Sequence, residues 1–407
     1  MTNTISFLKE LFPLSHHDRI LLVGGSVRDM MLGRASRDID LVAALSPDEL
    51  FSLGFRLVEA SSNATIYFQH HPGFGNIEVT RIDDMDDLEG DLLRRDFTIN
   101  AMALALNGSH IDPLDGREDL KAGLLRACSQ QTFSSDPLRI FRAFRFEADG
   151  WCMAPETAAQ IRREEWSTAF SDMPIERFSN EMLKALTGKS PEKFFQRMIE
   201  FNVGAEFLPE LFLMPQIPAG PLQHHPEGDL LSHSIQVLQR VATMSTDQLA
   251  RFCAFFHGLG KLATNPALYP KHHGHDNAGF AMAVDFCARL HLSTEQRNAL
   301  AWTSSLHGKA NMWETLRDAT KIAMAVGALK RGIVAVLPLV AAADKTGNQP
   351  LAGWDDAVRV AGMNTRDLGI DQEKLAAMPI SKRPPYIMQK RVEAFAAVTS
   401  KTRISTV

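Results

Sequence analysis

Two aspartates separated by one residue carry the clearest chemical signal in the chain. Asp38 and Asp40 stand in the segment RDID, within a stretch, Asp38–Ala43, whose composition predicts a β-strand. Side chains alternate along a strand, so both carboxylates point to one face while Ile39 and Leu41 point to the core. Neighbouring carboxylates repel each other unless cations join them, and hard oxygen ligands suit Mg²⁺ shared with substrate phosphates. Asp38 and Asp40 are therefore the candidate metal ligands and catalytic residues of a phosphoryl displacement.

A glycine turn precedes this strand and could hold an anion. Two glycines, ending at Gly25, follow the short apolar strand Ile20–Val23 and precede a helix expected to start at Ser26. Free N–H groups at such a helix start can bind a triphosphate, and Arg28 could add a guanidinium fork. Either motif alone is common in solvated turns. The order strand, turn, helix, strand makes the combination much more specific.

Bulk composition limits the classes of protein. With 407 residues the chain is long enough for two to three domains, and its apolar fraction of 45% is that of a packed globular protein. No apolar run reaches the roughly 18 residues of a membrane span, and the N-terminus does not resemble a signal peptide. Four cysteines without CxxC spacing favour a reducing cytoplasm over disulfides or a zinc ribbon. The net charge of −5 argues against a general nucleic-acid coat but permits a local basic track.

The pattern of apolar residues changes near residue 130. Residues 20–130 read as mixed α/β, and the later residues show helical periodicity with few β-branched runs. The expected strands are Ile20–Val23, Asp38–Ala43, 55–59, 65–69 and 77–82. The expected helices span 136–148, 155–167, 175–186, 191–201, Leu230–Met244, 246–257, 276–290, 294–304, 313–326 and 333–343. The chain is thus expected to be a small α/β head followed by a long helical arm.

Several motifs together resemble one known family. GGSVRDMMLG with RDID, RRDFTINAMAL (94–104), IDPLDGREDLKAGLLRA (111–127), DPLRIFRAFRFEA (136–148) and ERFSNEMLKAL (176–186) occur in family order. They resemble the class II tRNA nucleotidyltransferases and bacterial poly(A) polymerases of the DNA polymerase β-type superfamily. The resemblance implies an α+β fold, with a mixed-sheet nucleotidyltransferase head followed by an all-α neck, body and tail. We expect a catalytic head at 1–130, a neck at 131–205, an HD-like body at 206–350 and a tail at 351–407.

The resemblance also assigns the nucleotide-binding residues. Asp136 and Arg139 correspond to the pair that serves the family as a protein template, which would select C and A because both bases carry an exocyclic amine. Arg139 recurs with Arg142 and Arg145 at every third position, which predicts a basic stripe on one helix face. An exposed, solvated helix face would explain the same stripe. The full nucleotide-binding set is Gly25, Arg28, Arg95, Asp136, Arg139, Arg142 and Arg145, with tRNA and CTP as substrates and Mg²⁺ as cofactor.

Two departures from the family pattern bear on which bases are added. Ser135 stands where the family usually has a glutamate that braces the template arginine. Only 12 residues, half of them acidic, separate Arg81 from Arg94, where CCA-adding members usually carry a longer mobile loop. The short segment resembles that of enzymes that stop after CC, so addition of CC alone is expected. The alternative is complete CCA addition from CTP and ATP, with another segment doing the switching.

The helical arm resembles an HD phosphohydrolase region with one ligand missing. His233 and Asp344 match the pattern, but His257 is followed by Gly258 where the pattern has aspartate. We therefore expect weak or no metal binding there, with the histidines as packing or hydrogen-bonding groups. The nearby HHGH cluster (272–275) could be an adventitious metal site or an RNA contact, but neither is favoured over a polar surface loop. A phosphate track for the tRNA body is expected from Arg162, Arg163, Lys184, Lys189, Lys193 and Arg197, which could equally form a solvated face.

Three other functions remain open on sequence grounds. A poly(A) polymerase shares the head motifs, an HD-type metal phosphohydrolase would use the arm, and a non-catalytic tRNA-binding protein would need neither aspartate. Glu78, on a neighbouring predicted strand, could serve as a third carboxylate or base. No DNA or membrane partner is expected, and the oligomeric state stays open, a monomer included.

Overall fold

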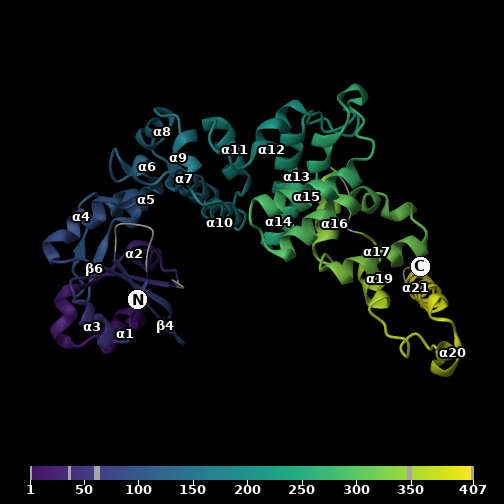
Figure 1. The fold of residues 1–407 in the computed structure, drawn as a ribbon, viewed down its shortest axis with the longest axis horizontal. Helices are drawn as coiled ribbons and strands as arrows, with labels where there is room; N and C mark the ends of the chain where they lie inside the picture. The colour runs from purple at the N-terminus through teal and green to yellow at the C-terminus, as the bar shows by residue number, and fades with distance from the viewer. Residues whose placement is uncertain (1, 35–37, 59–64, 346–350, 405–407) are drawn as a thin grey trace. The chain divides into compact units, whose positions relative to one another are not determined.

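The computed structural model describes residues 2–34, 38–58, 65–345 and 351–404, and it divides into two compact units, Met1–Phe170 and Ser171–Val407 (Figure 1). The boundary between the units falls inside the segment predicted as the neck, and the four-part division made from the sequence stays a prediction. The first unit holds the strands, and the second unit is helical in its described residues.

A mixed β-sheet is the framework of the first unit. Within the described residues its strands lie in the order β3-β4-β5-β2-β1-β6-β7, with β2 parallel to β5 and the other neighbours antiparallel. The strands are β1 Ile20–Val23, β2 Asp38–Ala43, β3 Arg56–Val58, β4 Thr65–His71, β5 Gly75–Arg81, β6 Ala103–Ala105 and β7 His110–Ile111, and a separate parallel pair joins β8 Leu124–Leu125 to β9 Cys152–Met153.

Helices flank this sheet. They are α1 Thr2–Leu11, α2 Gly24–Met31, α3 Pro47–Ser52, α4 Leu88–Leu93, α5 Gly116–Ala122, α6 Thr132–Ser135, α7 Leu138–Ala148, α8 Pro155–Arg162 and α9 Ser167–Ser171, with 3₁₀ turns η1 Leu14–Arg19, η2 Met85–Asp87 and η3 Thr98–Asn100. Leu88 and Leu92 of α4 pack with Leu21, Val23 and Val42 in one core cluster. Burial of these apolar side chains fixes the strand that carries the two aspartates.

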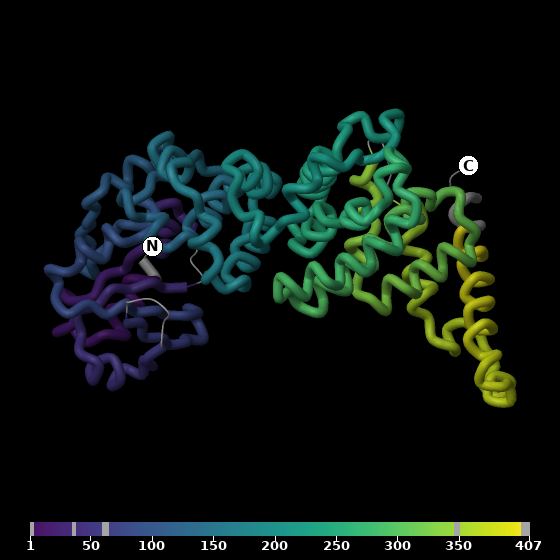
Figure 2. The backbone as a smooth tube through the Cα atoms, turned by 45° about the horizontal axis from the view of Figure 1, so that its top comes forward, coloured from purple at the N-terminus to yellow at the C-terminus, as the bar shows by residue number. Residues whose placement is uncertain are grey.

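The second unit is a stack of helices around the α15–α16 pair (Figure 2). Its helices are α10 Ile175–Ala185, α11 Glu192–Phe201, α12 Pro209–Leu213, α13 Leu230–Met244, α14 Gln248–Phe256, α15 His275–Arg289, α16 Thr294–Ala310, α17 Asp318–Arg331, α18 Val336–Asp344, α19 Trp354–Ala361, α20 Gln372–Ala377 and α21 Arg383–Ile404. The 3₁₀ turns are η4 Met214–Gln216, η5 Leu259–Ala263, η6 Pro266–Leu268, η7 Trp313–Thr315 and η8 Ile380–Lys382. Buried phenylalanines stack between helices; the rings of Phe195 and Phe255 lie 3.7 Å apart.

Most predicted elements are confirmed, and several boundaries are wrong. The predicted helix 294–304 continues to Ala310, and the predicted helix 333–343 begins only at Val336. The predicted helix 313–326 is a 3₁₀ turn followed by α17, because Leu316 and Arg317 are extended. The predicted helix 155–167 ends at Arg162. Of the predicted strand 55–59, position 59 lies outside the described residues.

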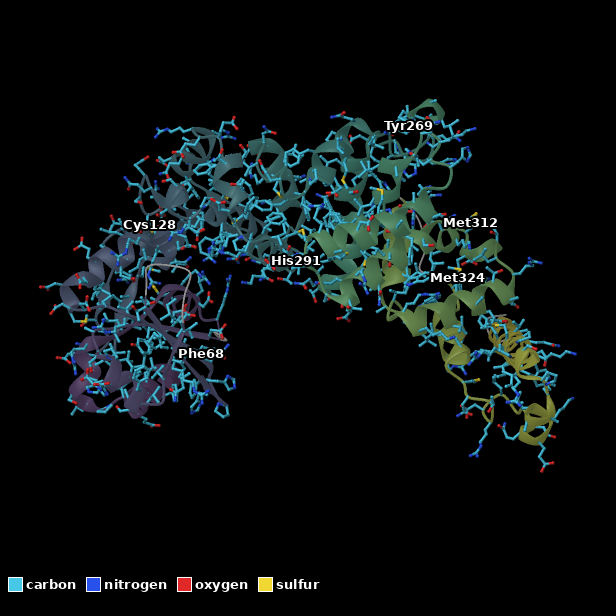
Figure 3. The ribbon with its side chains drawn as sticks, viewed as in Figure 1. Phe68, Cys128, Tyr269, His291, Met312 and Met324 are labelled. Atoms are coloured by element: carbon cyan, nitrogen blue, oxygen red, sulfur yellow. The ribbon has the colours of Figure 1, made fainter. Side chains whose placement is uncertain are left out.

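Two further features of the structure concern targeting and redox state. Among the described residues, none of the helices combines the length and apolar character that crossing a bilayer requires. All four cysteines are free thiols; Cys128 (labelled in Figure 3), Cys253 and Cys287 are buried, and Cys152 is exposed.

Candidate active site

Three carboxylates lie on one face of the sheet, on its neighbouring interior strands β2 and β5. Asp38 is exposed and Asp40 half-buried on β2, whereas Ile39 and Leu41 between and after them are buried, as the alternation predicted. Strand β5 runs parallel to β2 and places Glu78, which is exposed, directly opposite Asp40. The strand register thus brings Glu78 to the face that carries both aspartates, which is where a third carboxylate of the site would have to lie.

Hydrogen bonds of Ser26 connect strand β2 to the start of α2. Its hydroxyl donates to the carbonyl of Asp38 at 3.0 Å and accepts from the N–H of Asp40 at 2.9 Å, and the side chain is buried. The two backbone groups that flank Ile39 are thereby satisfied by one side chain. The sequence analysis missed this role, although a small hydroxyl residue directly after the glycine turn was a signal for it.

Burial and mutual repulsion both raise the pKa of two of these carboxylates, Asp40 and Glu78. Burial raises the pKa of Asp40, Arg95 opposes the rise, and the Asp38 charge adds to it. Burial also raises the pKa of Glu78, and Asp40 and Asp38 raise it further. Carboxylates that lie side by side on neighbouring strands and repel one another fit a divalent cation, whose charge would offset the repulsion.

The glycine turn brings backbone close to the catalytic face. Gly24 has φ +65°, and a methyl group added there would lie 2.9 Å from Nη1 of Arg95 and 3.4 Å from a carboxylate oxygen of Asp40. Helix α2 begins at this glycine rather than at Ser26 as predicted. A cavity of about 250 Å³ opens here, lined by Gly24, Gly25, Arg28, Asp40, Arg95, Asp96, Asn100, Arg142, Arg145 and Phe146. The structure thus brings the predicted glycine, one predicted aspartate and four predicted arginines to one cavity.

Arg95 is oriented by an acidic residue of the short segment. Its Nε and Nη2 donate to one oxygen of Asp91, at 3.2 and 2.9 Å, and both side chains are largely buried. These bonds use one edge of the guanidinium and leave Nη1 beside Gly24. Asp91 belongs to the acidic stretch that the sequence analysis treated only as a missing loop, so its positioning role was not predicted.

Arg142 forms a buried ion pair with Asp96. Its Nε and Nη2 lie 2.9 and 2.6 Å from Oδ2 of Asp96, whose other oxygen accepts from Asn100 and from the backbone of Phe97. Burial alone would raise the pKa of Asp96, but the Arg142 charge and these hydrogen bonds outweigh it and lower the pKa to about 2. Asn100 in turn accepts from Arg28 at 2.7 Å. One polar network therefore joins the two arginines across the cavity.

Arg139 is held mainly by main-chain carbonyls. It donates to the carbonyls of Arg94 at 2.7 Å, Thr132 at 3.2 Å and Arg95 at 3.4 Å, and to the hydroxyl of Ser135 at 3.2 Å. The neutral contact expected of Ser135 is thus present, as one of several. Asp136, directly before α7, accepts from the N–H of Leu138 at 3.2 Å. The two template candidates both lie at the start of α7.

Arg145 and Arg28 approach one aromatic ring. The guanidinium carbon of Arg145 lies 4.3 Å, and that of Arg28 5.3 Å, from the ring centroid of Phe146. The ring face attracts both cations and holds them on the cavity wall. Phe141 and Phe144, which lie between the basic positions of the same helix, are fully buried.

A second, larger cavity lies beside the first. It measures about 710 Å³ and is lined by Thr65, Thr80, Arg81, Ile82, Asp83, Asp87, Asp91, Arg94, Arg95 and Arg139. The short acidic segment, which folds as η2 and α4, forms part of its wall. Arg95 lines both cavities, so the two open onto the same guanidinium.

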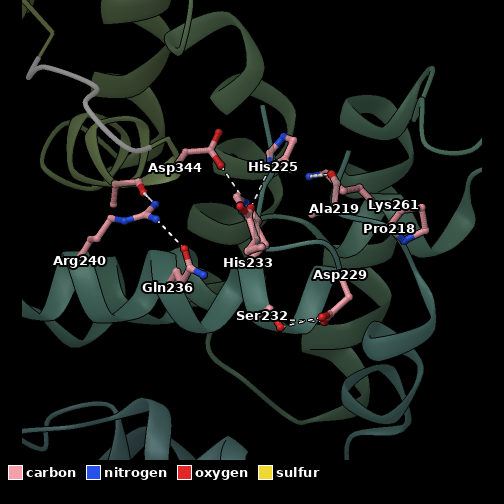
Figure 4. A network of polar contacts seen from close by, with 12 residues as sticks. Pro218, Ala219, His225, Asp229, Ser232, His233, Gln236, Arg240, Lys261 and Asp344 are labelled. Atoms are coloured by element: carbon pink, nitrogen blue, oxygen red, sulfur yellow. Dashed lines mark hydrogen bonds and ion pairs between the residues drawn. The ribbon is translucent and has the colours of Figure 1, made fainter. Parts of the chain in front are cut away.

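The HD-like residues of the second unit do come together. Nε2 of His233 lies 3.0 Å from one oxygen of Asp344 (Figure 4). Nε2 of His257 lies 3.2 Å from the same oxygen, and all three side chains are buried. Nδ1 of His233 lies 2.7 Å from a carboxylate oxygen of Glu227. Both nitrogens of His233 therefore face carboxylates, and the bonds to Asp344 and Glu227 outweigh burial and raise its pKa.

Position 258 offers no ligand to this group, because glycine has no side chain. A methyl group added at Gly258 would lie 2.9 Å from a side-chain carbon of Leu230, so apolar packing occupies the place of the missing carboxylate. Asn311 donates to the second oxygen of Asp344. Ligand atoms of His233, His257 and Asp344 lie within 4.8 Å of one another, a spacing that could hold a metal ion, so the expectation of weak or no metal here stays a prediction.

The expected phosphate track is mostly exposed. Arg162, Arg163, Lys184 and Lys189 are exposed, and Lys193 and Arg197 are half-buried. Arg163 donates to Gln130 at 3.4 Å, and Arg197 pairs with Glu200. A role of these residues in RNA binding stays a prediction.

Comparison with known proteins identifies the family of the chain. Residues 20–71 and 54–126 match the family model described as "Poly A polymerase head domain", and residues 150–214 match "Probable RNA and SrmB- binding site of polymerase A". The "Multifunctional CCA protein" of Methylococcus capsulatus is 32% identical over 413 residues, which cover 96% of this chain and 94% of that protein.

Solved structures share the fold along nearly the whole chain. The CCA-adding enzyme of Bacillus stearothermophilus in complex with CTP aligns with a TM-score of 0.64 at 21% identity, covering 94% of this chain and 89% of that one. The CCA-adding enzyme of Thermotoga maritima complexed with tRNA aligns with a TM-score of 0.60 at 22% identity, covering 94% and 91%. The chain therefore belongs to the class II tRNA nucleotidyltransferases, among the relatives of the multifunctional CCA proteins.

Proposed function

We propose that this nucleotidyltransferase adds complete CCA to tRNA 3′ ends, from CTP and ATP and with Mg²⁺. The observation that carries the proposal is the pairing of Asp38, Asp40 and Glu78 on one face of the sheet with the arginine-lined cavity beside it. Carboxylates and guanidinium groups at that spacing suit a triphosphate, and a CCA-adding enzyme of the same fold is complexed with CTP.

Complete CCA addition is preferred here over the CC-only activity expected from the short segment. The relative from Methylococcus capsulatus, which matches 96% of this chain, is called a multifunctional CCA protein, and that name favours the fuller activity. The short segment between Arg81 and Arg94 is also connected by hydrogen bonds to Arg139, the proposed base-selecting arginine. Asp91 in that segment binds Arg95, and the carbonyls of Arg94 and Arg95 hold Arg139. A long loop is therefore not the sole candidate for the switch from C to A.

Each group has a distinct task in the proposed reaction. A divalent ion held by Asp38 and Asp40 would supply Lewis acidity to the tRNA 3′-hydroxyl and offset charge on the phosphates. Arg28, Arg95 and Arg142 would bind and orient the triphosphate for in-line attack at its α-phosphorus. Pyrophosphate leaves, its charge stabilised by Arg28 and the N–H groups of the glycine turn.

A tRNA that ends at the discriminator base tests this proposal. It is incubated with CTP, with ATP, and with both, and its 3′ ends are sequenced. We expect CC from CTP alone and CCA from the mixture. Ends that stop at CC in the mixture would support the CC-only activity, and long A tails from ATP would support a poly(A) polymerase.

Arg139→Ala is expected to relax base selection. Matching one base edge is worth about 1–3 kcal/mol, so the preference for CTP over UTP should fall by roughly 10- to 100-fold. Competition between CTP and UTP at limiting tRNA measures the ratio of kcat/KM. Arg163→Ala, a loss of the same charge at an exposed position of the first unit, should leave the ratio unchanged. An unchanged ratio in Arg139→Ala would remove this residue from the template.

Asp91→Asn is expected to weaken nucleotide binding more than chemistry. A hydrogen bond to a charged group is worth about 1.5–3 kcal/mol, so KM for CTP should rise roughly tenfold or more as Arg95 loses its orientation. Steady-state kinetics with saturating tRNA separates KM from kcat. Asp86→Asn, an exposed acid of the same segment, is the matched control. Equal kinetics for the two variants would contradict a positioning role.

A further inference from the structure

We propose that Phe68 and Arg56 form the subsite for the 3′-terminal nucleotide of the tRNA, with the terminal base stacked on the Phe68 ring. This subsite rests on the proposed function, because it names where the RNA substrate of that reaction ends. Phe68 lies on β4 and Arg56 on β3, outside the arginine-lined cavity. Neither residue belongs to the sequence motifs of the head.

The strand register places Phe68 on the catalytic face. Asp40 on β2 pairs with Glu78 on β5, and Glu78 pairs in turn with Phe68 on β4. Phe68 pairs with Arg56 on β3, the outermost described strand at this end of the sheet. Directly paired residues point to the same face of a sheet, so the four side chains form one row across it. The row runs from two carboxylates to an aromatic ring and then to a guanidinium.

Exposure along β4 agrees with this placement. Phe68, labelled in Figure 3, is half-buried, whereas Tyr67 beside it in the chain is buried. The Tyr67 ring makes an edge contact with Phe51 of α3, their centroids 5.7 Å apart, so α3 covers the opposite face of the sheet at this point. Phe68 therefore keeps exposed ring surface on the face that α3 does not cover.

The geometry of the reaction requires the tRNA end on this side of the carboxylates. The phosphate-binding groups Gly25 and Arg28 lie on the other side of Asp40, in helix α2 after strand β1. Strand β1 neighbours β2 on one side, and β5 neighbours it on the other. In a phosphoryl displacement the attacking and leaving oxygens are roughly in line, so pyrophosphate departs toward β1 and α2. The attacking 3′-hydroxyl then approaches from the side of Glu78 and β4.

Spacing across the sheet fits one nucleotide. Neighbouring strands lie about 4.8 Å apart, so the backbone at Phe68 stands roughly 10 Å from that at Asp40. A 3′-hydroxyl is separated from the base of its own nucleotide by the ribose ring alone. A hydroxyl held at Asp40 thus places its base above β5 and β4, where the Phe68 ring is a stacking surface.

The order of charges along the row matches the order of groups at an RNA end. The three carboxylates repel phosphates, so an uncharged base suits the position next to Glu78 better than the RNA backbone does. Arg56 is exposed one strand beyond the ring and can pair with the phosphate that joins the last two nucleotides. Contacts of this kind position RNA without reading its sequence.

Stacking also suits a substrate whose terminal base varies. In the proposed reaction the enzyme first meets the discriminator base, which differs among tRNAs, and then C. A phenylalanine ring has no hydrogen-bonding group, and stacking on an aromatic side chain accepts every base because every base has a π-face. Asp136 and Arg139 are then left to select the incoming nucleotide alone.

Kinetics with tRNA and CTP varied separately test the ring. Phe68→Ala is expected to lower kcat/KM for tRNA by roughly 10- to 100-fold, while KM for CTP changes by no more than about twofold. The loss should be similar for the four discriminator bases, and Phe68→Tyr should act as the parent does because it keeps the ring. Phe51→Ala removes an exposed phenylalanine from the opposite face and should also match the parent.

The salt dependence of tRNA binding tests the phosphate contact. One such contact contributes about 0.7 to the slope of log affinity against log salt for a single strand, so Arg56→Gln should flatten the slope by that amount. Fluorescence anisotropy of labelled tRNA without nucleotide measures it. Arg117→Gln, at an exposed arginine on α5 of the same unit, is the matched control. Equal slopes for the two variants would remove Arg56 from the subsite.

Cross-linking without nucleotide separates this subsite from the proposed function. A tRNA with 5-iodouridine as its 3′-terminal nucleotide is irradiated on the full chain, and the cross-linked peptides are identified by mass spectrometry. We expect the peptide that contains Phe68 from the parent and no cross-link to it in Phe68→Ala. Cross-links to other segments alone, or a parent-like kcat/KM in Phe68→Ala, would overturn the subsite. Either result leaves CCA addition intact, because sequencing of the parent's products tests that reaction by itself.

Discussion

Asp40→Asn should reduce nucleotide incorporation by roughly 10³-fold or more while leaving the protein folded. A metal ion contributes several kcal/mol of charge stabilisation at the transition state, and each 1.36 kcal/mol is about a factor of ten. Asn keeps the shape of Asp40 and the backbone bond to Ser26 but removes the charge that would bind the ion. Single-turnover incorporation of CTP into tRNA measures the effect. Asp18→Asn, an exposed acid in η1, is the matched control.

The same variant should become more stable without metal. Burial raises the pKa of Asp40 from 3.8, so the ionised form opposes folding. The stability that protonation of such a carboxyl gives to the folded state is fully present below the pKa of the unfolded state. It is lost as the pH rises through the higher pKa of the folded state. In EDTA at pH 7 the first unit of Asp40→Asn should therefore unfold at higher temperature than the parent, and the difference should shrink toward pH 3. Mg²⁺ should stabilise only the parent. Equal stability and equal response to Mg²⁺ would contradict the assignment.

Arg142→Met should destabilise the first unit by ~3–5 kcal/mol at pH 7. Asp96 is only 7% exposed, and removal of its partner leaves a buried charge uncompensated. The chain has two units, so stability should be followed by hydrogen exchange of peptides from β1 and β2 during urea unfolding. Asp96→Asn combined with Arg142→Met removes both charges and should recover part of the loss. A double variant no more stable than Arg142→Met would show that packing, not charge, dominates.

The ion pair also predicts how acid affects the parent. The pKa of Asp96 falls from 3.8 to about 2 in the folded state, so its contribution is present above about 4 and is lost as pH falls toward 2. Arg142→Met lacks this contribution. The gap in stability between parent and variant should therefore close between pH 4 and pH 2, which urea unfolding at each pH measures.

The catalytic face could be predicted from sequence because it depends on local rules. Alternation in β2 places Asp38 and Asp40 on one face, and the glycine turn before α2 follows from the motif. The stripe of Arg139, Arg142 and Arg145 follows from helical spacing, and the structure confirms that Phe141 and Phe144 face inward. Such features need only the period of the element that carries them.

The supporting residues could not be predicted, because their roles depend on tertiary contacts. Asp91 and Asp96 are two acids among many in the sequence, and only the fold brings one to Arg95 and the other to Arg142. Pro384 and Pro385 would be expected to interrupt a helix, but both lie in the first turn of α21, where a missing N–H costs nothing.

The carbonyl cradle around Arg139 has a consequence for fidelity. The peptide groups that hold this guanidinium belong to Arg94 and Arg95, and the Arg95 side chain faces the glycine turn. Moving the base-reading edge therefore displaces the same stretch of backbone that grips the phosphates. In such an enzyme, a substitution that changes the base specificity also changes the affinity for the triphosphate of the incoming nucleotide.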